Sequence, residues 1–307
     1  MVLKSMGVSK EISALERKLP VGPTSQRTEK PIAAAALASE CHGEGVPVVA
    51  IHGLGPDRQL MVGCLEPIFT TRKGYRRLYL DLPGMGESAP ASGLGGSDEV
   101  LAALLAFIDD HLGSDPFLLI GESYGGYLAR GVLQNRSPQV LGLALICPIG
   151  RTVINKDRNV PEHRVLVAEP ALLERIGDTG EFHDNAVVQT FETWRRTQDE
   201  VVVGMNRANQ SAVDRIRERY ELTETPDGQS KFDCPALIVA GRQDAVTGYA
   251  DTYPLLENFT RASFAVLDRA GHNLQIEQPD LFEVLINEWL DRVEEREGAE
   301  LHGAPAG

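Results

Sequence analysis

The stretch FLLIGESYGG, residues 117–126, decides the fold. Its apolar first part, Phe117–Ile120, predicts a strand, and Tyr124–Leu133 predicts a helix directly after it. Ser123 stands at the turn between them in a G-x-S-x-G pattern, where the flanking glycines let the strand and helix backbones approach closely. Such a turn exposes the serine hydroxyl, so we interpret Ser123 as a nucleophile. The alternative is a glycine-rich turn with an incidental serine.

Outward from this turn, several short apolar runs predict further strands. They are nearly continuous rather than alternating, which is typical of parallel strands that are covered on both faces. Two segments, Asp98–Leu112 and Leu281–Val293, carry apolar residues at helical spacing. Alternating strands and helices indicate an α/β fold. The other predicted strands are Val46–Ile51, Arg77–Leu82, Val140–Ile146, Ala236–Ala240 and Ser263–Leu267.

One long segment, Gly150–Phe232, contains no strand-like run and carries charged, helix-favouring stretches. A structureless loop of that length is improbable in a compact domain, so we predict a helical insertion between two strands. The expected domain organisation is an N-terminal extension (1–30), a first part of the α/β core (31–149), the insertion (150–232), a second part of the core (233–297) and a flexible tail (298–307).

The turn HGLG, residues 52–55, follows the first predicted strand. Its glycines allow the backbone N–H of Leu54 to face Ser123 from one side, while the N–H of Tyr124, at the start of the predicted helix, faces it from the other. Two such donors form an oxyanion hole, which stabilises negative charge on a carbonyl oxygen. The alternative is an ordinary strand-end turn. We interpret His52 as a structural residue that hydrogen-bonds the loop.

Asp244 and His272 each follow a predicted strand, and the carboxyl ends of parallel strands meet at one edge of a sheet. A serine hydroxyl is a weak nucleophile until a base removes its proton, which is the role predicted for His272. An aspartate then fixes the histidine tautomer and stabilises the imidazolium, and the order Ser, Asp, His suits this architecture. Taken singly, either residue is more often structural. The fallback acids are Asp81, Glu87 and Asp251.

The composition narrows the class of partner. The chain has 44 acidic and 30 basic residues, a net charge of −14, which argues against nucleic acid or an anionic membrane as partners. We expect no metal ion or organic cofactor, because no His, Cys or carboxylate group has metal-ligand spacing. The cysteines form no C-x-x-C pair and the N-terminus lacks an apolar signal segment, so we expect a cytoplasmic location. We also expect a small-molecule substrate, and a protein that is a monomer or a homodimer.

Five ordered motifs together resemble the α/β-hydrolase superfamily, in particular its capped branch with a serine nucleophile. That branch includes esterases, C–C bond hydrolases and proline iminopeptidases. The resemblance implies an eight-stranded, mostly parallel sheet flanked by helices, with a helical cap inserted after strand 6, here Val140–Pro148. The motifs are HGLG (52–55), DLPGMGES (81–88), GESYGG (121–126), GRQD (241–244) and GHNLQIEQPDLF (271–282).

Two departures from the sequence patterns of the superfamily help to choose among its groups of enzymes. Dehalogenases and epoxide hydrolases carry an aspartate where this chain has Ser123, so both are disfavoured. The turn HGLGPD replaces the H-G-G-P-G turn of many C–C bond hydrolases and proline iminopeptidases. This difference weakens the resemblance to both groups.

The first hypothesis is therefore hydrolysis of a small or medium-sized carboxylic ester, with Ser123, Asp244 and His272 as the triad. The second is cleavage of an amide, a lactone or a C–C bond by the same groups. A third, of another class, is a small-molecule receptor or binding module on a hydrolase fold. Met85, Phe191 and Trp194 are predicted to contact substrate; the alternative for the two aromatic residues is packing.

Overall fold

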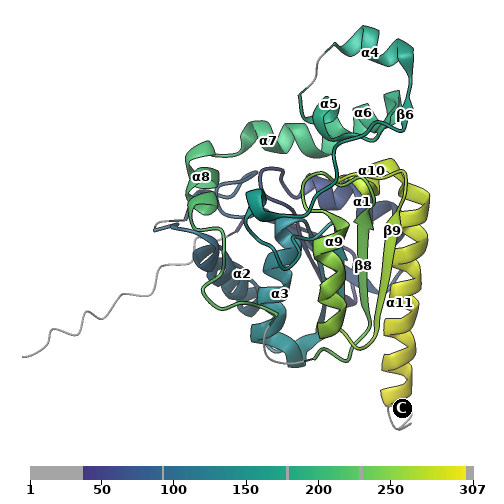
Figure 1. Cartoon of the computed structure of the whole chain (residues 1–307). Helices are drawn as coiled ribbons and strands as arrows, with labels where there is room; N and C mark the ends of the chain where they lie inside the picture. The colour runs from purple at the N-terminus through teal and green to yellow at the C-terminus, as the bar shows by residue number, and fades with distance from the viewer. Residues whose placement is uncertain (1–36, 92, 178–179, 228–230, 302–307) are drawn as a thin grey trace, which may run out of the picture. The chain divides into compact units, whose positions relative to one another are not determined.

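A twisted sheet of seven strands forms the centre of the computed structural model, which describes residues 37–91, 93–177, 180–227 and 231–301 (Figure 1). Strand β1 pairs antiparallel with β3 at one edge, and all the other neighbouring strands are parallel. The strands, in their order across the sheet, are β1 (Ser39–His42), β3 (Tyr75–Leu80), β2 (Val46–Ile51), β4 (Phe117–Glu122), β5 (Val140–Ile146), β8 (Ala236–Gly241) and β9 (Ala262–Leu267).

Helices cover both faces of the sheet because its strands are apolar on both sides. Side chains of α1 (Gln59–Thr71) and α11 (Pro279–Leu301) pack on one face. Side chains of α2 (Ser97–Leu112) and α3 (Tyr124–Arg136) pack on the other. In β2, for example, Val48 belongs to the first cluster and Val49 to the second. The near-continuous apolar runs of the sequence follow from this double coverage.

The expectation of eight strands is not met, since the sheet has seven within the described residues. The N-terminal extension (1–30) and the residues up to 36 lie outside the described ranges. The strand that precedes the insertion is β5, the fifth of the described strands, where the sixth was expected. Helix α11 continues to Leu301, four residues into the segment expected to be a flexible tail, and residues 302–307 are outside the description.

The segment between β5 and β8, called here the insertion, is largely helical but also holds a two-stranded parallel pair, β6 with β7. The strands have two residues each, too few to produce an apolar pattern, and β7 falls inside a stretch expected to be helix. Figure 1 shows α7 and α8 lying across one edge of the sheet. The elements are η2 (Asn155–Asp157), β6 (Val167–Ala168), α4 (Pro170–Ile176), α5 (Glu181–Asn185), β7 (Val188–Gln189), α6 (Phe191–Thr197), the π-helix η3 (Gln198–Val202), α7 (Val203–Arg207) and α8 (Gln210–Glu218).

Four short elements lie between the longer ones of the core. They are η1 (Ser137–Gln139), α9 (Tyr249–Thr252), η4 (Tyr253–Asn258) and α10 (Leu274–Glu277). No helix in the described ranges has the length and apolar character needed to cross a membrane.

Candidate active site

Three predicted residues meet at the carboxyl edge of the sheet, where α/β folds hold their ligands. Ser123 follows the end of β4, Asp244 follows β8, and His272 lies in the loop after β9. The Nε2 atom of His272 lies 2.9 Å from the Oγ atom of Ser123, and its Nδ1 atom lies 3.0 Å from the Oδ2 atom of Asp244. One chain of hydrogen bonds therefore joins the hydroxyl, the imidazole and the carboxylate.

The turn at Ser123 has a backbone conformation that is rare for a residue with a side chain, with φ of 53°. The turn is held by the N–H of Ser123, which donates to the carbonyl of Ile146 at 2.9 Å. A Cβ atom at Gly121 would meet the carbonyl of Gly125, and one at Gly125 would meet the carbonyl of Ile51. The surrounding backbone thus requires both glycines and maintains the strain at Ser123.

Asp244 is completely buried and is held as a charged group. Burial alone would raise its pKa, but the charge and hydrogen bond of His272 and the donors of Thr247 keep that pKa well below its usual range. The hydroxyl of Thr247 donates to Oδ2 at 2.6 Å, and the N–H groups of Val246 and Thr247 donate to Oδ1 at 2.8 and 3.0 Å. These bonds fix the carboxylate in the orientation that His272 needs.

His272 is surrounded by acidic groups. Burial alone would lower its pKa, but the charge and hydrogen bond of Asp244, together with Glu122 and Glu181, raise it to about 9. The Oε1 atom of Glu122 lies 3.5 Å from Nε2, on the side of the ring that faces Ser123. Burial raises the pKa of Glu122 to about 7, although His272 opposes that change. A second carboxyl group therefore lies directly beside the hydroxyl and the imidazole.

The backbone N–H groups of Leu54 and Tyr124 have no protein acceptor among the described residues. Tyr124 is the first residue of α3, so its N–H has no partner inside the helix. The turn before Leu54 is fixed by His52, whose Nε2 accepts from the N–H of Leu82 at 3.0 Å. The other ring nitrogen, Nδ1, therefore carries the proton and donates to the carbonyl of Gly53 at 2.7 Å. Both N–H groups are thus available to a ligand at the turn of Ser123.

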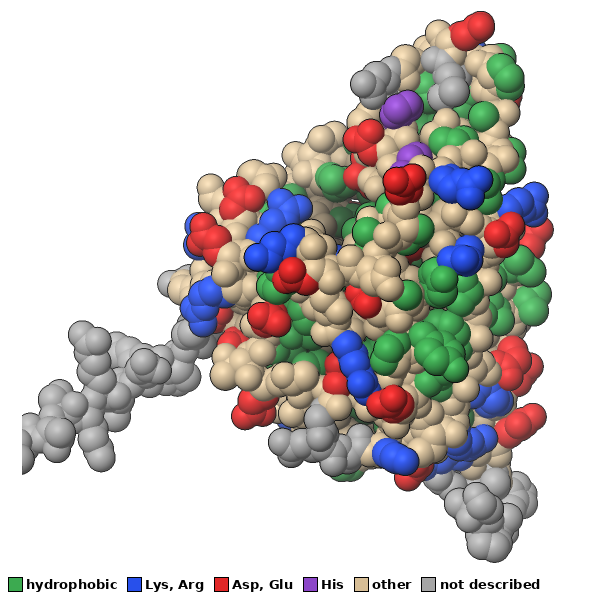
Figure 2. Space-filling view, viewed as in Figure 1, with side chains coloured by type: hydrophobic (Ala, Val, Ile, Leu, Met, Phe, Trp, Pro, Cys, Tyr) green, Lys and Arg blue, Asp and Glu red, His purple; other side chains and the backbone are tan. Residues whose placement is uncertain are grey.

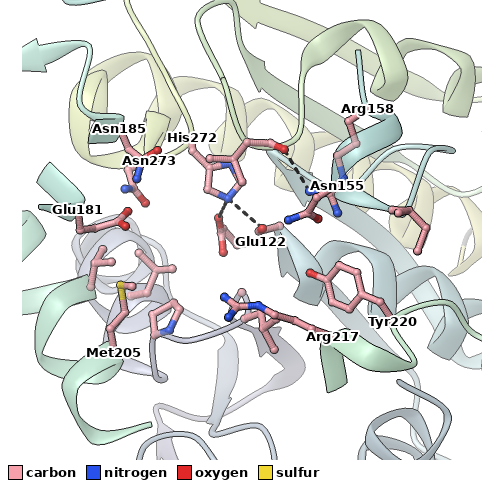
Figure 3. A pocket seen from close by; sticks show the side chains of 18 of the residues that line it. Glu122, Asn155, Arg158, Glu181, Asn185, Met205, Arg217, Tyr220, His272 and Asn273 are labelled. Carbon is pink, nitrogen blue, oxygen red and sulfur yellow. Dashed lines mark hydrogen bonds and ion pairs between the residues drawn. The ribbon is translucent and has the colours of Figure 1, made fainter. Parts of the chain in front are cut away.

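A cavity of about 480 Å³ opens onto Ser123 and His272 (Figure 3). Apolar residues from both sides of the cavity contribute to its lining, among them Leu54 and Leu60 from the core and Val201 and Met205 from the insertion. Its polar groups are divided between two walls. Figure 3 shows Glu181, Asn185 and Asn273 on one side of His272, Asn155, Arg158 and Tyr220 on the other, and the side chain of Arg217 below the imidazole.

The three residues predicted to contact substrate do not line this cavity. Met85 is fully buried, and its sulfur accepts from the N–H of Gly55 at 3.3 Å. Phe191 is 46% exposed and packs against Trp194, with 5.6 Å between the ring centroids. Trp194 in turn packs on the apolar cluster around Phe182 within the insertion. Their helical spacing of three residues reflects packing inside the insertion, which was the alternative interpretation.

The fallback acids have other partners. Asp81 accepts from the backbone N–H of Arg58 through Oδ1 and from its guanidinium through Oδ2, and Glu87 accepts from the same guanidinium at 2.7 Å. Asp251 accepts from the N–H of Asn159 at 2.8 Å. Asp244 is thus the acid that the structure brings to His272.

Sequence reasoning missed Glu122 and the polar residues that the insertion places around the cavity. Glu122 could have been found, because it stands next to Ser123 in the G-x-S-x-G pattern. It also missed Glu277, a buried carboxylate that accepts from the N–H groups of Val187, Val188 and Gly271. Burial raises the pKa of Glu277 to about 7, against the effect of these three donors. Glu277 thereby links β7 of the insertion to the loop of His272.

One cluster of potential metal ligands occurs in the described ranges, formed by Cys147, Asp244 and His272. It does not suit a metal ion. Burial raises the pKa of the Cys147 thiol well above its ordinary value, whereas a metal needs the thiolate. Both ring nitrogens of His272 already have protein partners.

Comparison with known proteins agrees with the observed fold. The family model of the alpha/beta hydrolase fold matches residues 46–279, well over half of the chain. The chain belongs to this family, in its serine-nucleophile branch. The crystal structure of an alpha/beta superfamily hydrolase from Oenococcus oeni PSU-1 is 30% identical, with a TM-score of 0.77, and the match covers 85% of this chain and 97% of that one.

Two curated relatives are more distant. The dihydrolipoyllysine-residue acetyltransferase component of the acetoin cleaving system of Pseudomonas putida is 29% identical over 254 residues, which are 78% of this chain. The chain spans only 62% of the length of that relative. The 2-hydroxy-6-oxo-6-(2'-aminophenyl)hexa-2,4-dienoic acid hydrolase of Metapseudomonas resinovorans is 26% identical, with 78% of this chain and 82% of that protein covered.

Proposed function

We propose that this hydrolase cleaves a small or medium-sized carboxylic ester through an acyl-enzyme on Ser123. The observation that carries the proposal is the continuous chain of hydrogen bonds from Asp244 through His272 to Ser123, beside two backbone N–H groups without acceptors. A binding module needs no such chain, because binding alone does not require an activated hydroxyl.

In the proposed reaction, His272 Nε2 takes the proton of Ser123 Oγ while Oγ attacks the ester carbonyl carbon. The carbonyl oxygen becomes an oxyanion, which the N–H groups of Leu54 and Tyr124 stabilise. The C–O bond to the alcohol then breaks, and the alcohol leaves with the proton from His272. A water molecule, deprotonated by His272, attacks the acyl-enzyme, which releases the acid and restores Ser123.

We infer that residues 150–232 act as the cap of this site and that the substrate is a small molecule. The insertion supplies much of the cavity lining, including Ile154, Glu181 and Tyr220. The cavity volume of about 480 Å³ lies in the range typical of small-molecule sites.

A second candidate is cleavage of an amide, a lactone or a C–C bond by the same triad. The relative from Metapseudomonas resinovorans favours it, because that protein is named as a hydrolase of an oxo-dienoic acid. A ketone carbonyl, like an ester carbonyl, can accept a serine nucleophile and form an oxyanion.

The test is a panel of p-nitrophenyl esters of increasing acyl length, with the wild-type protein, Ser123→Ala and Ser114→Ala. Ser114 is an exposed loop residue before β4, so its substitution is a matched control. We expect the wild type and Ser114→Ala to turn over short esters, and Ser123→Ala to lose as much as ~10⁶-fold in kcat.

Labelling with a fluorophosphonate separates the alternatives if the esters are inert. Labelling that Ser123→Ala abolishes would mean an activated serine with another substrate, such as an amide or a diketone. A chain that neither cleaves the esters nor reacts with the probe would be a binding module.

A further inference from the structure

The cavity wall opposite Glu181 is rich in positive charge, in contrast to a chain whose net charge is −14. Three cationic side chains line the cavity: Lys156, Arg158 and Arg217. Figure 2 shows Lys and Arg side chains gathered at one rim of a hollow on this face of the molecule. Such a local concentration calls for a physical explanation, because like charges repel one another.

Arg158 is the most informative of the three, because it is only 8% exposed and has neutral partners. Its two terminal nitrogens donate to the backbone carbonyls of Val246 at 3.0 Å and Val153 at 2.6 Å. Its guanidinium carbon lies 5.9 Å from the centre of the Tyr220 ring. Its Nε atom is buried without any acceptor, and within the described ranges no carboxylate forms an ion pair with it. A buried guanidinium without a counter-ion is costly, so an anion in the cavity would stabilise it.

The other two cations are also weakly paired. The nearest acidic partner of Arg217 is Asp214, 3.8 Å away, and both side chains are more than half exposed. Lys156 is exposed, and no ion pair joins it to any of the residues that the structure describes. Both are free to turn toward a ligand in the cavity. Figure 3 shows the side chain of Arg217 reaching in below His272 and Glu122.

The acidic groups are on the catalytic side. Glu122 lies beside His272, and Glu181 with Asn185 and Asn273 lies across the imidazole from the cationic wall (Figure 3). The cavity is therefore polarised, with carboxyl groups gathered around His272 and cationic groups on the wall that holds Arg158, from which Arg217 reaches inward. A substrate with an anionic end would bind in one orientation only, with that end against the cations.

We propose that Arg158, Arg217 and Lys156 bind a carboxylate of the substrate, at the end remote from the bond that is cleaved. The substrate class is thus a monoester of a small dicarboxylic acid, or a compound of the same charge pattern. This inference rests on the proposed function for the cleavage step, and on the charges of the wall alone for the binding step.

The test compares three p-nitrophenyl esters of equal acyl length and different terminal charge: the hexanoate, the monoester of adipate, and the 6-(trimethylammonio)hexanoate. Hydrolysis in the presence of Ser123→Ala is subtracted, because a carboxylate can assist cleavage of its own ester. We expect the wild type to prefer the adipate monoester over the hexanoate by at least about tenfold in kcat/KM, and to disfavour the cationic ester.

Arg217→Gln and Lys156→Gln should each lower that preference by about threefold, and together by about tenfold. The ratio of two substrates isolates recognition, because general damage to catalysis affects both. Arg158 is left unchanged, since it also holds two backbone carbonyls. Arg195→Gln is the matched control: this arginine lies on α6, is 49% exposed where Arg217 is 55% exposed, and is absent from the cavity lining.

The outcomes separate this inference from the proposed function. Ester hydrolysis without a preference for the adipate monoester, or with a preference for the cationic ester, overturns the inference and leaves the proposed function intact. If no ester is hydrolysed, calorimetry with adipate itself decides. Binding to the wild type that weakens about tenfold in the double variant supports the cationic wall, and equal or absent binding overturns it.

Discussion

The two sides of the cavity differ in how the sequence encodes them. On the sheet side, the residues of the proposed triad follow strands, and their positions are fixed by buried backbone, as at Ser123 with its φ of 53°. On the insertion side, the lining comes from short helices and the loops beside them. We expect the sheet side to carry the proposed chemistry and the insertion side to set the choice of substrate.

The largest expected effect tests the sheet side. Asp244→Asn keeps the size of the side chain but removes the charge that fixes the tautomer of His272. We expect kcat on the best ester to fall by about 10⁴-fold. Asp251→Asn, which alters a fallback acid bound to the N–H of Asn159, should change kcat by less than about threefold. Steady-state kinetics on both variants check this, and similar losses in the two would mean that Asp244 is not the triad acid.

The sheet side was largely predictable from the sequence, because its requirements are local. The apolar runs gave the central strands, and the glycines around Ser123 identified the turn. Asp244 and His272 were recognisable because each follows a strand. The eighth strand was an expectation from the family alone, and the central sheet has seven strands within the described residues.

The insertion side was not predictable in the same way. Arg158 and Arg217 are 59 positions apart in a region without a repeating pattern, and only tertiary packing brings them to one wall. Phe191 and Trp194 have the spacing of a helix face, which does not tell whether the face meets a cavity or other apolar side chains. The strand pair β6 and β7 is too short to leave a signal.

A smaller expected effect concerns the pH dependence of kcat/KM. Carboxyl groups on both sides of the cavity, Glu122 and Glu181, influence it through the pKa of His272. Only the neutral imidazole can accept the proton of Ser123, and the pKa of His272 is raised to about 9. The kcat/KM of the wild type should therefore rise with pH until about 9. Glu122→Gln removes one of the charges that raise this pKa, so the rising limb should move to lower pH. A shift of one unit would increase kcat/KM about tenfold at pH 7.

The pH profile of an ester hydrolysed by both proteins checks this. Glu181→Gln should shift the limb in the same direction but less, because Glu181 contributes less than Glu122 to the pKa of His272. Glu218→Gln, at an exposed position on α8, should leave it in place. A limb that stays fixed or moves to higher pH in Glu122→Gln would contradict the electrostatic role given to Glu122.

The smallest expected effects come from two substitutions in the insertion, one outside the cavity and one in its lining. Phe191→Ala removes a side chain outside the cavity, so kcat/KM should change by less than about twofold, although the insertion loses some packing. Met205→Ala, in the cavity lining, should change the order of preference among esters of different acyl length. An acyl-length profile measured for both variants checks this. A changed profile in Phe191→Ala with an unchanged one in Met205→Ala would mean that Phe191, and not Met205, lies near the bound substrate.

The hydrogen bonds of Glu277 couple the position of the insertion to that of the loop that carries His272. Its carboxylate accepts two N–H groups from the insertion, at Val187 and Val188, and one from Gly271, next to His272. If the insertion lifts to admit a substrate, the carboxylate loses two of three donors, and the loop that carries His272 loses its anchor at the same moment. Substrate entry and reaction would then be separate steps of one cycle, because His272 is held against Ser123 only while the insertion covers the cavity.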